Sequence, residues 1–170
     1  MNNEFPITKN NNDLKNYIYE VISGLGLTRG IVSLADFNAQ MPGDNAATIA
    51  PGASLNFPNN GPIVGTDITR LSANTFNLVS PGYYQVMWQV SVDEAGQLLV
   101  ALNGAEIITS CSGRATGTNQ IVGMCVVQVV APNSSLAIRN PLGNATALTI
   151  TPIAGGAHTV SAHLVIVRMA

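Results

Sequence analysis

Hydrophobic and polar residues alternate in short segments along most of the chain after residue 30. Segments rich in Val, Ile, Thr, Leu and Tyr recur about every ten residues, with Pro, Gly, Asn and Ser between them, as in an antiparallel β-sandwich or barrel. This pattern predicts strands over residues 30–38, 54–57, 68–71, 75–79, 83–92, 97–102, 106–110, 121–130, 135–140, 148–152 and 159–168. Residues 41–65 contain four prolines, so we expect mostly loop there, around one short edge strand.

The predicted strand 83–92 divides into two sets of side chains, because successive residues of a strand point to opposite faces. The even-numbered set is apolar and is the predicted core: Tyr84, Val86, Trp88, Val90 and Val92. The odd-numbered set mixes polar and apolar side chains: Tyr83, Gln85, Met87, Gln89 and Ser91.

Two other predicted strands are apolar on both faces. They lie at residues 121–130, apart from Gln128, and at residues 164–167 near the end of the chain. In a monomeric sandwich the outer face of such strands would expose a few hundred Å² of contiguous apolar surface, which soluble monomers rarely tolerate. We therefore expect further copies of the chain to cover this face, with Met87, Val165 and Val167 in the contact.

The N-terminal residues follow a different period. Apolar residues fall at helical spacing after a cap at Asn12 or Asp13, and Gly24 and Gly26 end the predicted helix. A helix of about eleven residues is too short to be stable alone, so its apolar stripe must pack against its own domain, identical helices or a neighbouring molecule. We expect residues 1–30 to act as a connector and residues 31–170 to form one domain. The expected contacts of the connector are Phe5, Ile7, Leu14, Tyr17, Ile18, Val21 and Ile22.

Composition narrows the possible functions. Of the 170 residues, 46% are hydrophobic and 9% are charged, whereas about 25% of the residues of an ordinary soluble domain are charged. The net charge is −2 and no basic stripe exists, so nucleic acid is not an expected partner. We also find no apolar run long enough to span a membrane and no signal peptide, and we expect synthesis in the cytoplasm.

The sequence offers little catalytic chemistry. His158 and His163 are five residues apart on a predicted strand and would face opposite sides, so they cannot act together. Asp93 and Glu94 are the only adjacent carboxylate pair, and we interpret them as part of a solvated turn. No motif indicates an enzyme, a metal site or a cofactor.

Three further residues have two interpretations each. Cys111 and Cys125 are either small buried hydrophobes or the halves of a bond between neighbouring strands or chains. Arg114, within residues 110–119, either contacts a ligand from a loop tip or keeps that loop solvated.

Three segments together resemble a known superfamily. They are FNLVSPGYYQVMWQVSV at residues 76–92, LLVALNGAEI at residues 98–107 and HLVIVRM at residues 163–169. In this order they resemble the jelly rolls of the C1q and tumour necrosis factor superfamily, and most of all the C-terminal heads of collagen-like glycoproteins on bacterial spore surfaces. The resemblance covers residues 31–170 and implies a ten-stranded antiparallel double-sheet jelly roll that forms a homotrimer. Those spore heads follow a long collagen stem, whereas about 30 residues precede the first predicted strand here.

Two functions fit these observations. The first is a structural, self-assembling trimeric subunit of a bacterial spore surface layer or fibre, in the exosporium or coat. It would be made in the mother cell, and the N-terminal connector would dock on neighbouring trimers, a basal layer or other spore surface proteins. The alternative is a trimeric receptor- or ligand-binding head, such as an adhesin or phage-type fibre tip, with specificity in its apical loops.

Overall fold

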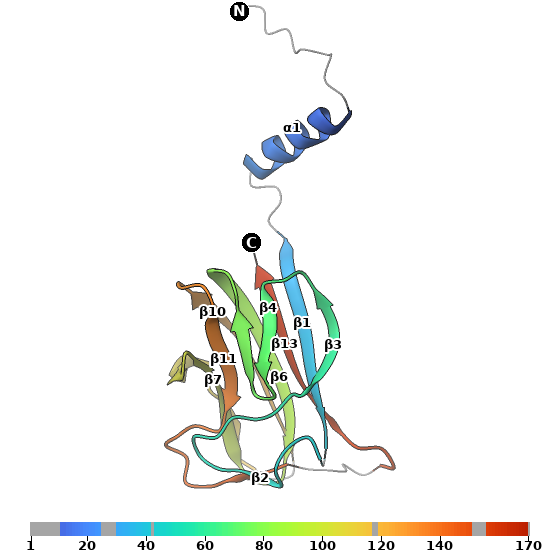
Figure 1. Ribbon diagram of the computed structural model, residues 1–170. Helices are drawn as coiled ribbons and strands as arrows, with labels where there is room; N and C mark the ends of the chain where they lie inside the picture. The colour runs from blue at the N-terminus through green and yellow to red at the C-terminus, as the bar shows by residue number, and fades with distance from the viewer. Residues whose placement is uncertain (1–10, 25–29, 42, 117–118, 151–155, 170) are drawn as a thin grey trace, which may run out of the picture. The chain divides into compact units, whose positions relative to one another are not determined.

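The computed structural model describes residues 11–24, 30–41, 43–116, 119–150 and 156–169 (Figure 1). The chain divides into two compact units, one containing residues 1–30 and the other Ile31–Met169. The described part of the first unit contains one helix, α1 (Asn11–Gly24), so the predicted short N-terminal helix is confirmed. Phe5 and Ile7 lie outside the described residues, as does the side chain of Ile22.

The second unit consists of antiparallel sheets. The first sheet has the order β10-β6-β13-β1-β3, with β10 (Asn119–Val129) and β3 (Asn59–Val64) at its edges. Its inner strands are β6 (Gly82–Val92), β13 (Ser161–Met169) and β1 (Ile31–Gln40). Because β1 and β13 pair along nearly their whole lengths, the two ends of this unit lie side by side.

The second sheet has the order β4-β5-β11-β7-β8, and a short strand β9 pairs with β7 off this path. These strands are β4 (Ile68–Ser72), β5 (Thr75–Leu78), β7 (Gly96–Leu102), β8 (Ala105–Glu106), β9 (Ser112–Arg114) and β11 (Ser134–Arg139). A separate two-stranded sheet joins β2 (Thr48–Ile49) to β12 (Leu148–Thr149). Figure 1 shows the two large sheets facing each other as a sandwich.

The core between the sheets contains the residues that the alternation in β6 predicts. The even-numbered side chains Tyr84 to Val92 are buried, and the Phe37 ring of β1 stacks on the Phe76 ring of β5 with 4.3 Å between centroids. Arg70 of β4 lies over the Phe37 ring at 4.7 Å. The all-β double-sheet prediction is therefore confirmed.

The edge strand of the first sheet is not where the sequence predicts it. Residues 54–57 form no strand and make only one isolated bridge, between Ser54 and Arg139, whereas β3 occupies Asn59–Val64. Arg70 fixes β3 by donating hydrogen bonds to the carbonyls of Phe57 and Asn59. Pro62 is tolerated because an edge strand leaves half of its N–H groups without a ladder partner.

Three other predicted strand boundaries are wrong. The strand predicted at 106–110 ends at Glu106, and Ile108–Ser110 is a 3₁₀ turn held by the Ser110 hydroxyl, which donates to the Ile107 carbonyl over 2.7 Å. Within the predicted loop 110–119, Ser112–Arg114 pairs with β7. The last strand begins at Ser161, so His158 precedes it and does not share a strand with His163.

Candidate assembly interface

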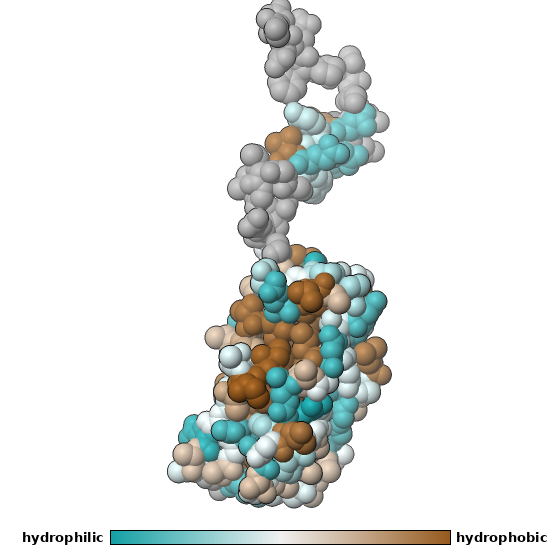
Figure 2. All heavy atoms as spheres, turned by 90° about the vertical axis from the view of Figure 1, so that its left-hand side faces the viewer, coloured by the Kyte–Doolittle hydropathy of each residue, from teal (hydrophilic) through white to brown (hydrophobic). Residues whose placement is uncertain are grey.

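The outer face of the first sheet carries exposed apolar side chains along β10. Val122, Met124 and Val126 are 62%, 65% and 59% exposed, while the residues that alternate with them point inward against the core. This is the two-sided apolar strand that the sequence predicts. Figure 2, which turns the β10 side of the domain toward the viewer, shows a continuous hydrophobic area on its middle and upper part.

Strand register extends this surface across the sheet. Met124 is paired with Met87, and Met87 with Val165, so one row of the outer face contains three apolar side chains from β10, β6 and β13. In the next row Val126 is paired with Gln85, and Gln85 with Val167. We call the following set the apolar patch: Tyr83, Met87, Met124, Val126, Val165 and Val167.

The structure thus places the predicted residues Met87, Val165 and Val167 side by side, on adjacent strands. Sequence reasoning missed Tyr83, Met124 and Val126 as individual site residues. The two-sided character of residues 121–130 was the signal that could have found Met124 and Val126, because it requires an outward-facing apolar set on that strand.

The other end of the outer face is polar apart from Val122, which is paired with Gln89. His163 of β13 is paired with Asn38 of β1 and Gln89 of β6, and its Nδ1 atom lies 3.0 Å from the Oδ1 atom of Asp36. Both side chains of this contact are partly exposed. A partner molecule that covers the outer face therefore contacts an apolar half and a hydrogen-bonding half. This asymmetry favours one orientation of the partner.

An ionic cluster lies where β13 ends. The Asp67 carboxylate accepts a 2.7 Å hydrogen bond from the Ser33 hydroxyl, and Arg168 Nη1 lies 3.4 Å from its Oδ2 atom. Hydrogen bonds from Ser80 and Ser33, with a smaller contribution from Arg168, hold the pKa of Asp67 below its usual value. The Tyr84 hydroxyl donates to the Ser80 carbonyl over 2.7 Å and so ties β6 to the same cluster.

The helix α1 carries a second exposed apolar surface, which we call the α1 stripe. Its members with described side chains are Leu14, Tyr17, Ile18 and Val21, each at least 41% exposed. They recur at the spacing that places side chains on one face of a helix. Within residues 11–24 no side chain with a described position is buried.

The two cysteines are free thiols. Cys125 is half-buried and packs against the core, as the interpretation of a small hydrophobe predicts. Cys111 is exposed, so that interpretation is wrong for it. Burial raises the pKa of both thiols, and Glu106 raises that of Cys111 further, so both stay protonated and weakly nucleophilic at neutral pH.

Glu94 lies in the turn between β6 and β7 and binds a neighbouring segment. Its carboxylate accepts a 2.7 Å hydrogen bond from the Thr149 backbone N–H and a further one from the Thr149 hydroxyl. These bonds lower the pKa of Glu94. The turn is as predicted, but Glu94 is a structural acceptor that holds β12 and is not simply solvated.

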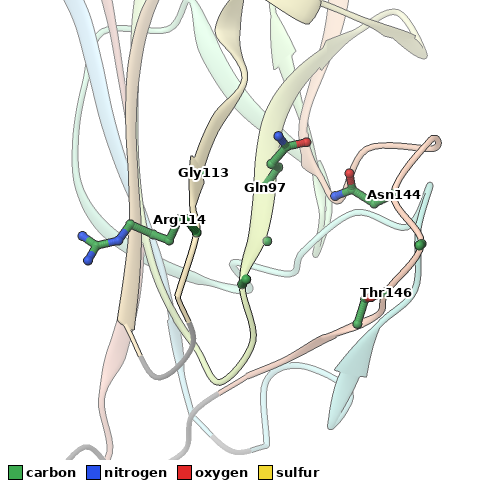
Figure 3. Close-up of a pocket in the computed structure, with 9 residues that line it drawn as sticks. Gln97, Gly113, Arg114, Asn144 and Thr146 are labelled. Carbon is green, nitrogen blue, oxygen red and sulfur yellow. The ribbon is translucent and has the colours of Figure 1, made fainter.

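A pocket of about 540 Å³ lies at one end of β7 and is lined by residues 95–97, 113–115 and 144–146. Figure 3 shows that the Arg114 side chain extends away from Asn144 and Thr146. Arg114 belongs to β9, where it is paired with Gly96, and is not at a loop tip. The pocket therefore combines amide and hydroxyl groups without a converging charge.

In the described part of the chain, no three His, Cys, Asp or Glu side chains lie close enough together to hold a metal ion. No helix within the described ranges is long and apolar enough to cross a membrane.

No known family model matches the chain, and no curated protein is similar to it in sequence. Solved structures do share its fold. The PRD1 vertex protein P5 is 16% identical, with a TM-score of 0.57 over 83% of this chain and 99% of that one. Murine APRIL at pH 8.5 is 11% identical, with a TM-score of 0.55 over 80% and 98% of the two chains.

The globular domain of the zebrafish complement 1qA protein gives a TM-score of 0.50 at 10% identity, over 78% of this chain and 93% of that domain. Similarity at such low identity establishes the fold alone. The second unit is therefore a jelly roll of the tumour necrosis factor and C1q type, as the sequence resemblance implied.

Proposed function

We propose that the chain is a structural subunit that assembles into a homotrimer through the outer face of its first sheet. The observation that carries the proposal is the apolar patch together with Val122. Single exposed apolar residues are ordinary on protein surfaces, but a contiguous set across three neighbouring strands marks an interaction site. Three copies around an axis form a closed assembly in which every copy covers the patch of a neighbour.

Low charge supports the same proposal. With 9% charged residues, a free-standing monomer has few groups to keep its surface solvated. Asp36 and His163 are the charged or titrating groups on this face that lie nearest the apolar patch, and they contact each other. A neighbouring copy would therefore bury few uncompensated charges.

We further propose that these trimers belong to a surface layer or fibre of a bacterial spore, with residues 1–30 as the connector to neighbouring trimers or a basal layer. The support is the resemblance of residues 76–92, 98–107 and 163–169 to spore-surface heads. The fold shared with a vertex protein is a further argument for a building block. Immunogold labelling of intact spores tests this location, and labelling confined to the cell interior would refute it.

The assembly itself is tested by light scattering after size-exclusion chromatography. We expect the wild-type chain at micromolar concentration to have three times the 17.7 kDa mass of one chain. The double variant Met124→Lys/Val126→Lys should be monomeric, because each lysine would carry an unpaired charge into the interface. Leu142→Lys is the matched control, since Leu142 is also strongly exposed, at 73%, but lies outside the first sheet. A monomeric wild type, or a trimeric double variant, would refute the proposed interface.

A binding head is the second candidate. The pocket beside β7 favours it, because three segments of the chain line it and include the amides of Gln97 and Asn144. The similar folds also include murine APRIL and the globular domain of the zebrafish complement 1qA protein. Electron microscopy separates the two functions. Purified chain that forms filaments or layers supports the structural subunit, whereas trimers that stay dispersed at high concentration, with or without residues 1–30, support the head.

A further inference from the structure

The α1 stripe has a spacing that suits packing against identical helices. Leu14, Ile18 and Val21 are separated by four and three residues, the alternation that repeats every 3.5 residues on average in a coiled coil. In a heptad with Ile18 at position a, Leu14 and Val21 occupy position d. Tyr17 flanks this seam, which widens the apolar face as in a helical bundle.

The charged residues of α1 lie off the seam. In the same heptad Asp13 and Glu20 fall at outward-facing c positions, and Lys15 falls at an e position beside the seam. Parallel copies of the helix can therefore meet along the α1 stripe without placing like charges against each other. We propose that the three α1 helices of one trimer pack in parallel as a three-helix neck.

The length of α1 indicates that the helix is not stable on its own. Fourteen residues span about 21 Å and make barely four turns, too few for a stable isolated helix in water. Two heptads also give too little buried surface for free helices to associate at micromolar concentration. The helices must therefore be brought together by something else in the chain, and the jelly rolls can do this.

The connection to β1 supplies the required proximity. Six residues separate α1 from Ile31, and a chain of that length reaches at most about 25 Å. Ile31 is paired with Met169, and Met169 with Tyr83 of the apolar patch, so β1 begins at the apolar end of the outer face. Ile31 and Val32 are themselves exposed there. Copies that meet through this end bring the starts of their β1 strands together.

Tethering then raises the local concentration of the helices. A short connection gives an effective concentration in the millimolar range, about a thousandfold above a micromolar solution. The inference rests on the proposed trimer, because the jelly rolls of the trimer must bring the helices together. It assigns the α1 stripe to contacts within a trimer, which leaves Phe5 and Ile7 as the connector residues for contacts between trimers.

Disulfide trapping tests the neck. In a background of Cys111→Ser and Cys125→Ala, the variant Ile18→Cys places a thiol on the seam, and Tyr19→Cys places one on the outward side as the matched control. Under mild oxidation with diamide we expect interchain dimers from Ile18→Cys at least tenfold more abundant than from Tyr19→Cys. The double variant Ile18→Cys/Val21→Cys should give covalent trimers, because two thiols per helix can link three chains.

Dilution distinguishes packing of α1 within a trimer from packing of α1 between particles. Cross-links within a trimer form at a yield that does not change over a hundredfold dilution, whereas cross-links between particles decrease with concentration. Equal yields at both sites, a yield that falls on dilution, or no cross-link in a sample that light scattering shows to be trimeric would each overturn the neck and leave the proposed trimer standing. A monomeric sample would instead refute the proposed trimer.

A variant without cysteines provides an independent measurement. Leu14→Asp/Ile18→Asp should remove the circular dichroism signal of helix at 222 nm, because the charges prevent packing of the seam, while the mass in light scattering stays that of a trimer. Asn16→Asp is the control on the outward side. Retention of the helical signal in the double variant would contradict the neck.

Discussion

The contact between Gly123 and Trp88 permits a quantitative prediction about the strand that carries the proposed interface. Gly123 of β10 is paired with Trp88 of β6, and both are buried. A Cβ atom added at Gly123 would lie 2.0, 2.2 and 2.6 Å from three atoms of the Trp88 ring. Non-bonded carbon atoms prefer about 3.5 to 4.0 Å, so the variant Gly123→Ala requires a shift of roughly 1.5 Å.

The indole ring has little room for such a shift. Trp88 is 2% exposed and is the largest of the fully buried side chains of the core. Overpacking of a dense core costs about 1 to 3 kcal/mol, and the overlap with three ring atoms places Gly123→Ala at the upper end, near 3 kcal/mol. For a domain of this size the melting temperature should fall by about 10 °C. Because β10 must move, trimer formation should weaken as well.

Urea unfolding followed by circular dichroism measures the effect. Gly143→Ala is the matched control, since a Cβ atom there meets nothing within 4 Å, and its free energy of unfolding should change by less than about 0.5 kcal/mol. In a Trp88→Phe background, Gly123→Ala should cost less than about 1 kcal/mol, because the clashing ring atoms are gone. A cost below 1 kcal/mol in the wild-type background, or an equal cost in both backgrounds, would refute the proposed packing of β10 on β6.

Two further predictions concern polar groups that hold the domain together. The lowered pKa of Asp67 means that its ionised form stabilises the fold above the ordinary aspartate pKa of about 3.9, and that this stabilisation is lost as pH falls through the lower pKa of the folded state. Asp67→Asn should therefore lower the melting temperature at pH 7 and have a smaller effect at pH 3; an equal loss at both values would contradict the role of the charge. Asn140 is fully buried and donates to the Ile49 carbonyl over 2.9 Å, so Asn140→Leu should cost about 2 kcal/mol in urea unfolding, since carbonyls lose their donor. An unchanged urea midpoint would show that the hydrogen bond from Asn140 to the Ile49 carbonyl does not stabilise the domain.

Periodicity was sufficient to predict the core of the first sheet. The alternation in β6 identifies the buried side chains because a strand with one face in the core has a period of two. The helix was equally predictable from its spacing. In contrast, β3 has the composition of a loop, with two asparagines, a glycine and a proline. It becomes a strand because β1 offers a free edge and Arg70 binds the carbonyls of Phe57 and Asn59 at its start.

The polar half of the outer face could not be predicted, because it depends on contacts between distant parts of the chain. Asp36 and His163 are 127 positions apart and meet only because β1 pairs with β13. The sequence indicated an isolated histidine, whereas the fold gives it a carboxylate partner. Four residues of the apolar patch needed less information, because Met124, Val126, Val165 and Val167 lie on strands that are apolar on both faces, so that one apolar set must be outward.

The two edges of the first sheet differ in a way that bears on which one is covered by another copy. Edge strands expose unpaired backbone groups, and soluble proteins protect them with charged residues, proline or an irregular register. β3 has two of these features, since it contains Pro62 and its register with β1 shifts between Ala35 and Phe37.

β10 has none of them. Its eleven residues include no charge and no proline, its register with β6 is continuous, and within the described residues β6 is its only ladder partner. A strand of this kind left in water would pair with other chains without control. The edge at β3 is therefore protected by its own sequence, whereas β10 lacks these features, although β9 and the Ile108–Ser110 turn lie close to part of it. Because β10 also carries Val122, Met124 and Val126, we expect the neighbouring copy in the proposed trimer to lie over the outer face of β10 as well as over the rest of the apolar patch.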